Sequence, residues 1–156
     1  MFSFKARRKK QDISLFMRRI IDLTSPNRPR ADDSRHDMRY NRSIPVICCP
    51  WRKNKPDTTQ LTVGITKDLT DSGMGIITTC DLQAEEIVVM VELPQSDTNE
   101  PWIFRGEVRQ ITDMPGGCSL YGVELMELLN SNVKVLETMI GIKKEFQSVP
   151  CESCLD

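Results

Sequence analysis

Six short apolar runs separated by turn residues occupy the middle of this chain, and they constrain its fold more than any other feature. The runs are rich in β-branched residues, and no segment with helical periodicity interrupts them. They cover residues 43–51, 59–70, 74–79, 87–93, 102–112 and 118–126. Proline, glycine, asparagine and aspartate gather in the segments between them. Short strands at this spacing, without intervening helices, predict a small antiparallel β-barrel or β-sandwich.

Helical periodicity precedes the strand-like region. In the N-terminal segment, apolar residues recur at helical spacing at Ile13, Phe16, Met17, Ile20 and Ile21. An isolated helix of this length is marginal in water, so this helix needs a surface to lie on. The candidate surfaces are the protein's own barrel, a partner protein or an anionic membrane.

A second helical pattern follows the strand-like region, over residues 130–147, with Asn130 or Ser131 as the expected N-cap. Its apolar stripe is expected to consist of Val133, Leu136 and Ile140, flanked by Met139 and Lys143. Residues 25–34 are polar and contain two prolines, which predicts a linker. We therefore divide the chain into a basic amphipathic extension and linker (1–33), a strand-rich domain with a C-terminal helix (34–147) and an irregular tail (148–156).

Charge is distributed unevenly along the chain. Residues 1–42 carry twelve Lys/Arg and five Asp/Glu, whereas residues 43–156 carry nine and seventeen. An anionic partner therefore meets the N-terminal end first. Nucleic acid is not an expected partner, because the strand-rich domain is acidic and only 6% of the residues are aromatic. A cytoplasmic location is expected, since no apolar run approaches the roughly 20 residues that span a bilayer and the N-terminus lacks the apolar core of a secretory signal.

Neither a catalytic site nor a metal site is expected. His36 is the only histidine, so the chain offers no Ser/His/Asp or Cys/His arrangement. It also lacks a phosphate-binding glycine loop with its lysine. Cys151 and Cys154 have the spacing of half a zinc site, but a closed zinc site takes four ligands. These features predict a binding protein rather than an enzyme.

Two short motifs carry the candidate binding chemistry. Arg35 and Arg39 stand four residues apart before the first strand-like run. Arginine pairs bidentately with phosphate or with the O6/N7 edge of guanine. Asp68 and Thr70 lie at i and i+2, on one face of a strand, and Gly73 follows at the turn, where glycine lets a ligand approach the backbone. Together these groups suit a guanine nucleotide with phosphates.

Each motif also has a purely structural interpretation. Arg35 and Arg39 lie in a charged stretch and could be solvated side chains. Asp68 and Thr70 could bond their own backbone in an ordinary turn, as Asp and Thr do at strand ends.

Arg35-x-x-x-Arg39 and Asp68-x-Thr70-x-x-Gly73 resemble the two signature motifs of PilZ domains. The resemblance continues at residues 74–77, 106–109 and 121–125 and covers residues 34–128. PilZ domains are six-stranded β-barrels that bind the bacterial second messenger cyclic di-GMP and carry no chemistry of their own. The resemblance therefore implies a mainly β bacterial protein with a six-stranded antiparallel barrel, to which the two predicted helices are added.

The resemblance also implies roles for the motif residues: Arg35 and Arg39 hold phosphate and guanine, Asp68 accepts from a guanine N–H, Thr70 replaces the usual serine, and Gly73 keeps the turn open. The family's first motif often begins with two arginines, and here Ser34 replaces the first of them. Nearby Arg42 is the residue expected to compensate for that loss.

Two functions remain open at this point. The first is a cyclic di-GMP receptor in which the ligand binds between residues 34–42 and the barrel near residues 68–73. Its binding reorders the N-terminal segment, which is expected to contact a protein partner or an anionic membrane. The second is a PilZ-like protein-interaction module that needs no nucleotide, which the substitutions at Ser34 and Thr70 favour.

Overall fold

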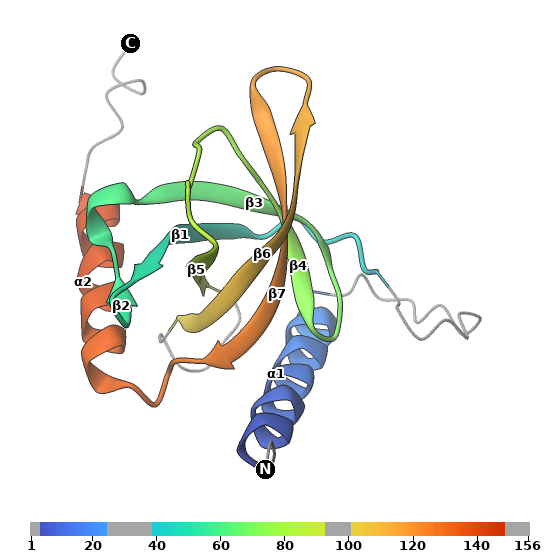
Figure 1. The fold of residues 1–156 in the computed structure, drawn as a ribbon, viewed down its shortest axis with the longest axis vertical. Helices are drawn as coiled ribbons and strands as arrows, with labels where there is room; N and C mark the ends of the chain where they lie inside the picture. Colours follow the sequence, from blue (N-terminus) through green and yellow to red (C-terminus); the bar gives the residue numbers. More distant parts are fainter. Residues whose placement is uncertain (1–3, 25–38, 93–100, 149–156) are drawn as a thin grey trace.

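The structure, a computed structural model, describes residues 4–24, 39–92 and 101–148. A closed antiparallel β-barrel forms its centre (Figure 1). The barrel strands are β1 (Pro45–Arg52), β3 (Thr62–Leu69), β4 (Gly73–Thr78), β5 (Glu86–Val91), β6 (Trp102–Met114) and β7 (Cys118–Leu128). They pair in the order β1-β3-β4-β7-β6-β5, and pairing of β5 with β1 closes the barrel. The predicted six-stranded antiparallel barrel is therefore confirmed, and the sandwich is excluded.

Two short elements that were not predicted follow β1. The strand β2 (Lys55–Pro56) turns back onto the end of β1, and the 3₁₀ turn η1 (Thr58–Gln60) leads into β3. Asp57 caps this turn by accepting from the backbone N–H of Thr59 at 3.1 Å. The predicted run over residues 59–70 therefore begins with a turn, and its strand starts later.

The strand β5 is apolar on both faces because each face is covered. Ile87, Val89 and Val91 point into the barrel and belong to its interior cluster. Val88 and Met90 point outward and pack in a second cluster with the helix α2 (Val133–Ser148). Successive residues of β5 therefore alternate between the barrel interior and the cluster under α2.

The N-cap of α2 is Asn132, so the predicted cap at Asn130 or Ser131 is wrong. The Asn132 side-chain oxygen accepts from the backbone N–H of Val135 at 3.3 Å. The Asn130 side chain instead ties this segment to β6, because it accepts from the N–H of Ile103 at 2.9 Å and donates to the carbonyl of Pro101 at 2.8 Å. A polar residue suited to capping is thus used for a tertiary contact.

The buried stripe of α2 also differs from the expected one. Val135, Met139 and Ile142 are buried against the outside of the barrel, with Leu136 beside them. Val133, expected in the stripe, is 64% exposed. Both stripes satisfy helical periodicity, and only packing against the barrel selects between them.

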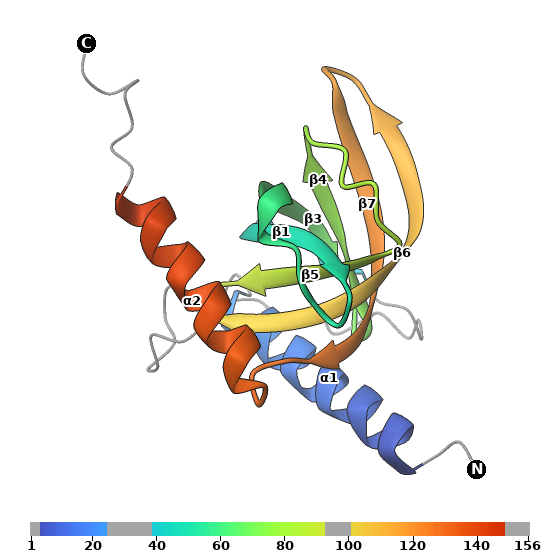
Figure 2. The ribbon, with the colours of Figure 1, turned by 60° about the vertical axis from the view of Figure 1, so that its left-hand side comes forward.

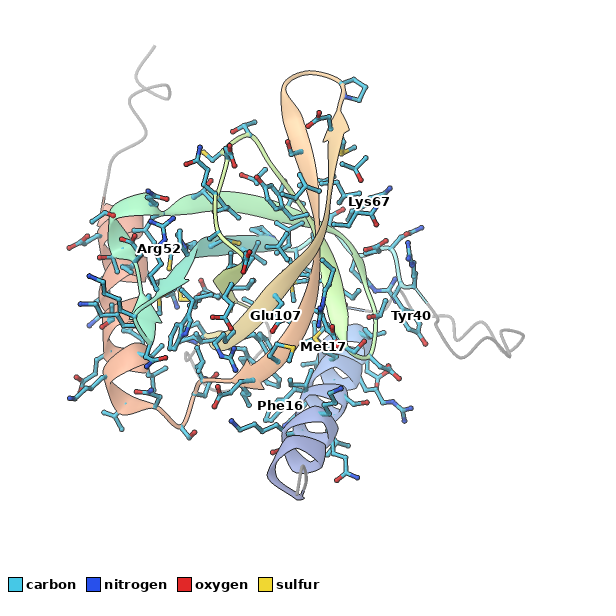
Figure 3. All side chains as sticks on the ribbon, in the orientation of Figure 1. Phe16, Met17, Tyr40, Arg52, Lys67 and Glu107 are labelled. Atoms are coloured by element: carbon cyan, nitrogen blue, oxygen red, sulfur yellow. The ribbon has the colours of Figure 1, made fainter. Side chains whose placement is uncertain are left out.

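The helix α1 (Phe4–Leu23) packs on the barrel, which was one of the three surfaces predicted for it. Its buried face consists of Ile13, Met17, Ile20 and Ile21, all part of the barrel's interior cluster. The ring of Phe16, which is labelled in Figure 3, meets Trp102 of β6 edge-on, with ring centroids 4.5 Å apart. The predicted apolar stripe is confirmed. The two helices lie on different sides of the barrel (Figure 2), and neither described helix is long and apolar enough to cross a membrane.

Candidate functional site

The second motif lies at the hairpin that joins β3 to β4. The N–H of Thr70 donates to the carbonyl of Gly73 at 2.9 Å, and the N–H of Gly73 donates to the Thr70 hydroxyl at 3.0 Å. The N–H of Ser72 donates to the same hydroxyl at 3.3 Å. The Thr70 hydroxyl therefore closes the turn by accepting from two backbone N–H groups.

Asp68 is aimed at the outside of the barrel by a local irregularity in β3. The pairing of β3 with β4 shifts register between Thr66 and Asp68. Oδ1 of Asp68 then accepts from the backbone N–H of Gly75 at 3.1 Å, across the strand pair. Oδ2 faces the guanidinium of Arg39, whose Nη1 lies 4.0 Å away. One carboxylate oxygen is thus fixed by the fold, and the other faces a cation.

Two glycines of β4 are required by close packing. A Cβ at Gly73 would lie 2.3 Å from the carbonyl oxygen of Val123 on β7, so glycine is needed here for contact between strands. A Cβ at Gly75 would lie 2.6 Å from Oδ1 of Asp68. Gly75 was not among the site residues expected from the sequence, although its spacing from Gly73 puts both on one face of β4.

The first motif reaches the second through a short stretch of backbone pairing before β1. The N–H of Tyr40 donates to the carbonyl of Leu69, and the N–H of Leu69 donates to the carbonyl of Tyr40, both at 2.8 Å. This bridge places Arg39 beside Asp68. Arg35, the first arginine of the motif, lies outside the described residues.

These groups line an open depression of about 400 Å³ on the outside of β3, β4, β6 and β7. Arg109 of β6, which sequence analysis did not select, is a second cation in it. Its Nε donates to Glu124 at 2.7 Å, and its Nη2 lies 2.9 Å from a carboxylate oxygen of Glu107. The sequence contained a pattern that could have indicated Arg109, because this residue ends the run of residues 106–109 that resembles PilZ domains.

Arg42, the expected auxiliary residue, does not join this depression. It lines a separate one of about 620 Å³, together with Pro45 and Met90. Its guanidinium carbon lies 5.8 Å from the centre of the Tyr40 ring. Its Nε is buried and makes no hydrogen bond to the described part of the chain.

The cysteines that the structure describes are free thiols. Burial, and secondarily the neighbouring Cys49, raises the pKa of Cys48 far above its usual value. Burial and the charge of Asp57 raise the pKa of Cys49 to about 12. No cluster of three or more potential metal ligands occurs within residues 4–24, 39–92 and 101–148. Cys151 and Cys154 lie outside these ranges.

A family model describing the PilZ domain matches residues 33–141. The chain belongs to the PilZ domain family. PilZ domains are receptor modules for cyclic di-GMP and are not enzymes. The match begins after α1, so this PilZ domain carries an additional N-terminal helix on its barrel.

Solved structures similar to this chain include a motility inhibitor and a PilZ domain. The inhibitor of motility MotI/DgrA of Bacillus subtilis is 15% identical over 78% of this chain, with a TM-score of 0.48. This chain spans 57% of the length of that protein. The PilZ domain of YcgR from Escherichia coli, solved with c-di-GMP, is 16% identical over 75% of this chain and 100% of its own, with a TM-score of 0.37. A search of curated proteins found no match.

Proposed function

We propose that this PilZ protein is a bacterial cytoplasmic receptor for cyclic di-GMP, which it binds in the depression between Arg39, Asp68 and Arg109. The observation that carries the proposal is the meeting of two motifs that are far apart in sequence. The Tyr40–Leu69 bridge and the irregularity in β3 bring a guanidinium and a carboxylate within 4.0 Å of each other in an open depression. Titration calorimetry with cyclic di-GMP tests the proposal.

Each group has a role that its chemistry suits. Arg39, with Arg35 from the same motif, pairs with ligand phosphate or with the O6/N7 edge of a guanine. The second oxygen of Asp68 accepts from a guanine N–H. Arg109, held by Glu107 and Glu124, offers the ligand a third guanidinium, whose charge these two carboxylates offset.

Thr70 and Gly73 shape this site in the proposed mechanism. The Thr70 hydroxyl already accepts two backbone N–H groups, and the additional methyl of threonine does not prevent this. Gly73 lets β4 approach β7 closely. Both residues thereby hold the strand end that presents Asp68.

Gly75→Ala is expected to weaken cyclic di-GMP binding about tenfold or more while the protein stays folded. The new methyl would displace Oδ1 of Asp68 from the Gly75 N–H, and a hydrogen bond to a charged group contributes about 1.5–3 kcal/mol. Calorimetry measures the affinity and circular dichroism the fold. Gly141→Ala is the control, because a Cβ there meets nothing within 4 Å. Unchanged affinity in Gly75→Ala would show that binding does not need this orientation of Asp68.

We further propose that α1 relays the signal. Nη2 of Arg18 on α1 lies 3.6 Å from a carboxylate oxygen of Asp71, which is part of the β3–β4 turn. In sequence, α1 is joined to Arg39 through the segment that contains Arg35. A ligand bound to Arg35 and Arg39 therefore acts on the segment that joins α1 to the barrel and on the β3–β4 turn that Arg18 contacts. The position of α1 on the barrel shifts if the ligand binds one position of α1 more tightly than another. The apolar face of α1 is then the surface for a protein partner, with an anionic membrane as the alternative.

The fluorescence of Trp102 is expected to report this relay, because its ring packs against Phe16 of α1. In a Trp51→Phe protein, saturating cyclic di-GMP should change the emission of Trp102. Adding Arg39→Ala to this protein should remove the change. Binding observed by calorimetry without any change in emission would exclude a relay through α1.

The alternative function is a PilZ-like interaction module that needs no nucleotide. One observation favours it: the bonds of Thr70 within its own turn account for part of the second motif without a ligand. A folded protein that releases no heat with cyclic di-GMP would support this alternative over the receptor.

A further inference from the structure

The outside of the barrel carries an apolar surface that begins at the edge of the α2 cluster, where Ile47 packs, and extends over residues that belong to neither buried cluster. We call it the outer apolar face, and it consists of Pro45, Ile47, Val63, Ile65, Ile77 and Leu120. On the central strand β3, Val63 is 52% exposed and Ile65 is 50% exposed. Outward positions of a barrel that face water are normally polar, and a contiguous apolar patch marks an interaction site.

Strand register shows that this patch is continuous. Ile65 pairs with Pro45 on one side and with Ile77 on the other, and Ile77 pairs with Leu120 of β7. Their side chains therefore form one row across four strands. Ile47 and Val63 form a second pair beside this row.

The outer apolar face continues the surface that α2 covers. Met90 lies under α2, and it also lines the depression of about 620 Å³ that contains Pro45, Ile47 and Val63. One half of this outer surface thus packs against a helix, and the other half has the same apolar chemistry. A second helix beside α2 would bury it in the same way.

The charges at its border select the kind of helix. Lys67 follows Ile65 on the outside of β3 and is exposed (Figure 3). Arg42 lines the depression, and its buried Nε makes no hydrogen bond to the described residues. The acidic Glu92 at the depression is neutralised by Lys143, at 2.6 Å. Asp68, next to Lys67, is offset by Arg39, whose Nη1 lies 4.0 Å from its carboxylate. With these two acidic residues paired, Arg42 and Lys67 leave the border net cationic, and a second copy of this chain would bring the same cations to the face.

We propose that the outer apolar face binds an amphipathic helix of a partner protein, with acidic side chains beside its apolar stripe. The apolar stripe packs on Val63 and Ile65, and the acidic side chains pair with Arg42 and Lys67. The proposal does not depend on nucleotide binding, although Leu120 also lines the nucleotide depression and places the two sites side by side.

Fluorescence anisotropy of the full chain with two labelled helical peptides tests this proposal. Both peptides have about 16 residues, or roughly 24 Å as a helix, and the same leucine stripe. One carries glutamates beside the stripe and the other lysines. The glutamate peptide should bind about tenfold tighter or more, because complementary charge adds specificity to the apolar contact. Lys67→Glu should reverse this preference.

Ile65→Glu should weaken binding of the glutamate peptide about tenfold or more, since it places a charge in the apolar contact. Ile111→Glu is the matched control: Ile111 is 55% exposed and pairs with Tyr121, which belongs to the interior cluster, so Ile111 lies on the opposite side of the sheet from the outer apolar face. Circular dichroism checks that both variants fold. Equal binding of the two peptides, no binding, or binding unaffected by Ile65→Glu would overturn the proposal.

If the outer apolar face binds a second copy of the chain or a membrane instead, the experiments give different results, and each of these results would overturn the proposal. A concentration-dependent dimer that Ile65→Glu abolishes would assign the face to a second copy. If the protein sediments with phosphatidylglycerol vesicles but binds neither peptide, and if Ile65→Glu abolishes the sedimentation, the outer apolar face binds a membrane.

Discussion

Replacing Arg35 and Arg39 together by alanine is expected to abolish most cyclic di-GMP binding and to leave the fold intact. In the proposed complex each guanidinium makes charge-assisted hydrogen bonds to the ligand, and bonds to charged groups contribute about 1.5–3 kcal/mol each. Losing both should therefore weaken binding on the order of 100-fold or more. Titration calorimetry of the double variant and of each single variant measures this loss.

Stability should change little in the Arg39→Ala variant. The Arg39 side chain is 75% exposed, and its pair with Asp68 spans 4.0 Å, so the pair contributes about 0–1 kcal/mol to folding. Arg19→Ala is the control for the loss of one positive charge, because Arg19 is exposed on α1. Affinity that is unchanged in both single variants would contradict the site assignment.

Met17→Ala is expected to lower the free energy of unfolding by about 2–5 kcal/mol, the range for removing a buried methionine side chain. Met17 is 0% exposed and lies in the barrel's interior cluster, although it belongs to a helix outside the PilZ match. Urea unfolding followed by circular dichroism measures the change. The expected loss of stability is large because α1 supplies part of the barrel core itself.

Leu15→Ala on the same helix is the matched control, because Leu15 is 67% exposed. Its effect should stay within about 0.5 kcal/mol, as for other surface substitutions. If Met17→Ala had an equally small effect, α1 would not be docked on the barrel in solution.

Patterns in the sequence were sufficient for the six barrel strands and for the buried face of α1, whereas the choice of a barrel over a sandwich came from the resemblance to PilZ domains. The six runs each overlap one barrel strand, because turn residues and β-branched runs act locally. The stripe that includes Ile13 and Met17 was correct because a single apolar face satisfies helical spacing in that segment. In α2, two apolar stripes satisfied helical spacing, and the prediction that Val133 belongs to the buried stripe was wrong.

The candidate site was predicted in part. The two motifs were found, and the structure joins Arg39 to Asp68, whereas Arg35 lies outside the described residues and remains a prediction. Gly75 and Arg109 were missed because their roles depend on contacts between strands. Arg42 was expected as an auxiliary site residue because it lies near the first motif in sequence, but it lines a different depression.

The sequence by itself determined which segments form the barrel strands and the helices, since periodicity and turn residues are local properties. Only the tertiary structure decided which groups meet. The register shift in β3 sets the direction of Asp68, and the Tyr40–Leu69 bridge sets the position of Arg39. The closure of β5 on β1 and the docking of α2 decide which outward apolar residues are covered and which, like Ile65, stay exposed. These outcomes depend on contacts between residues far apart in the chain, which no local pattern specifies.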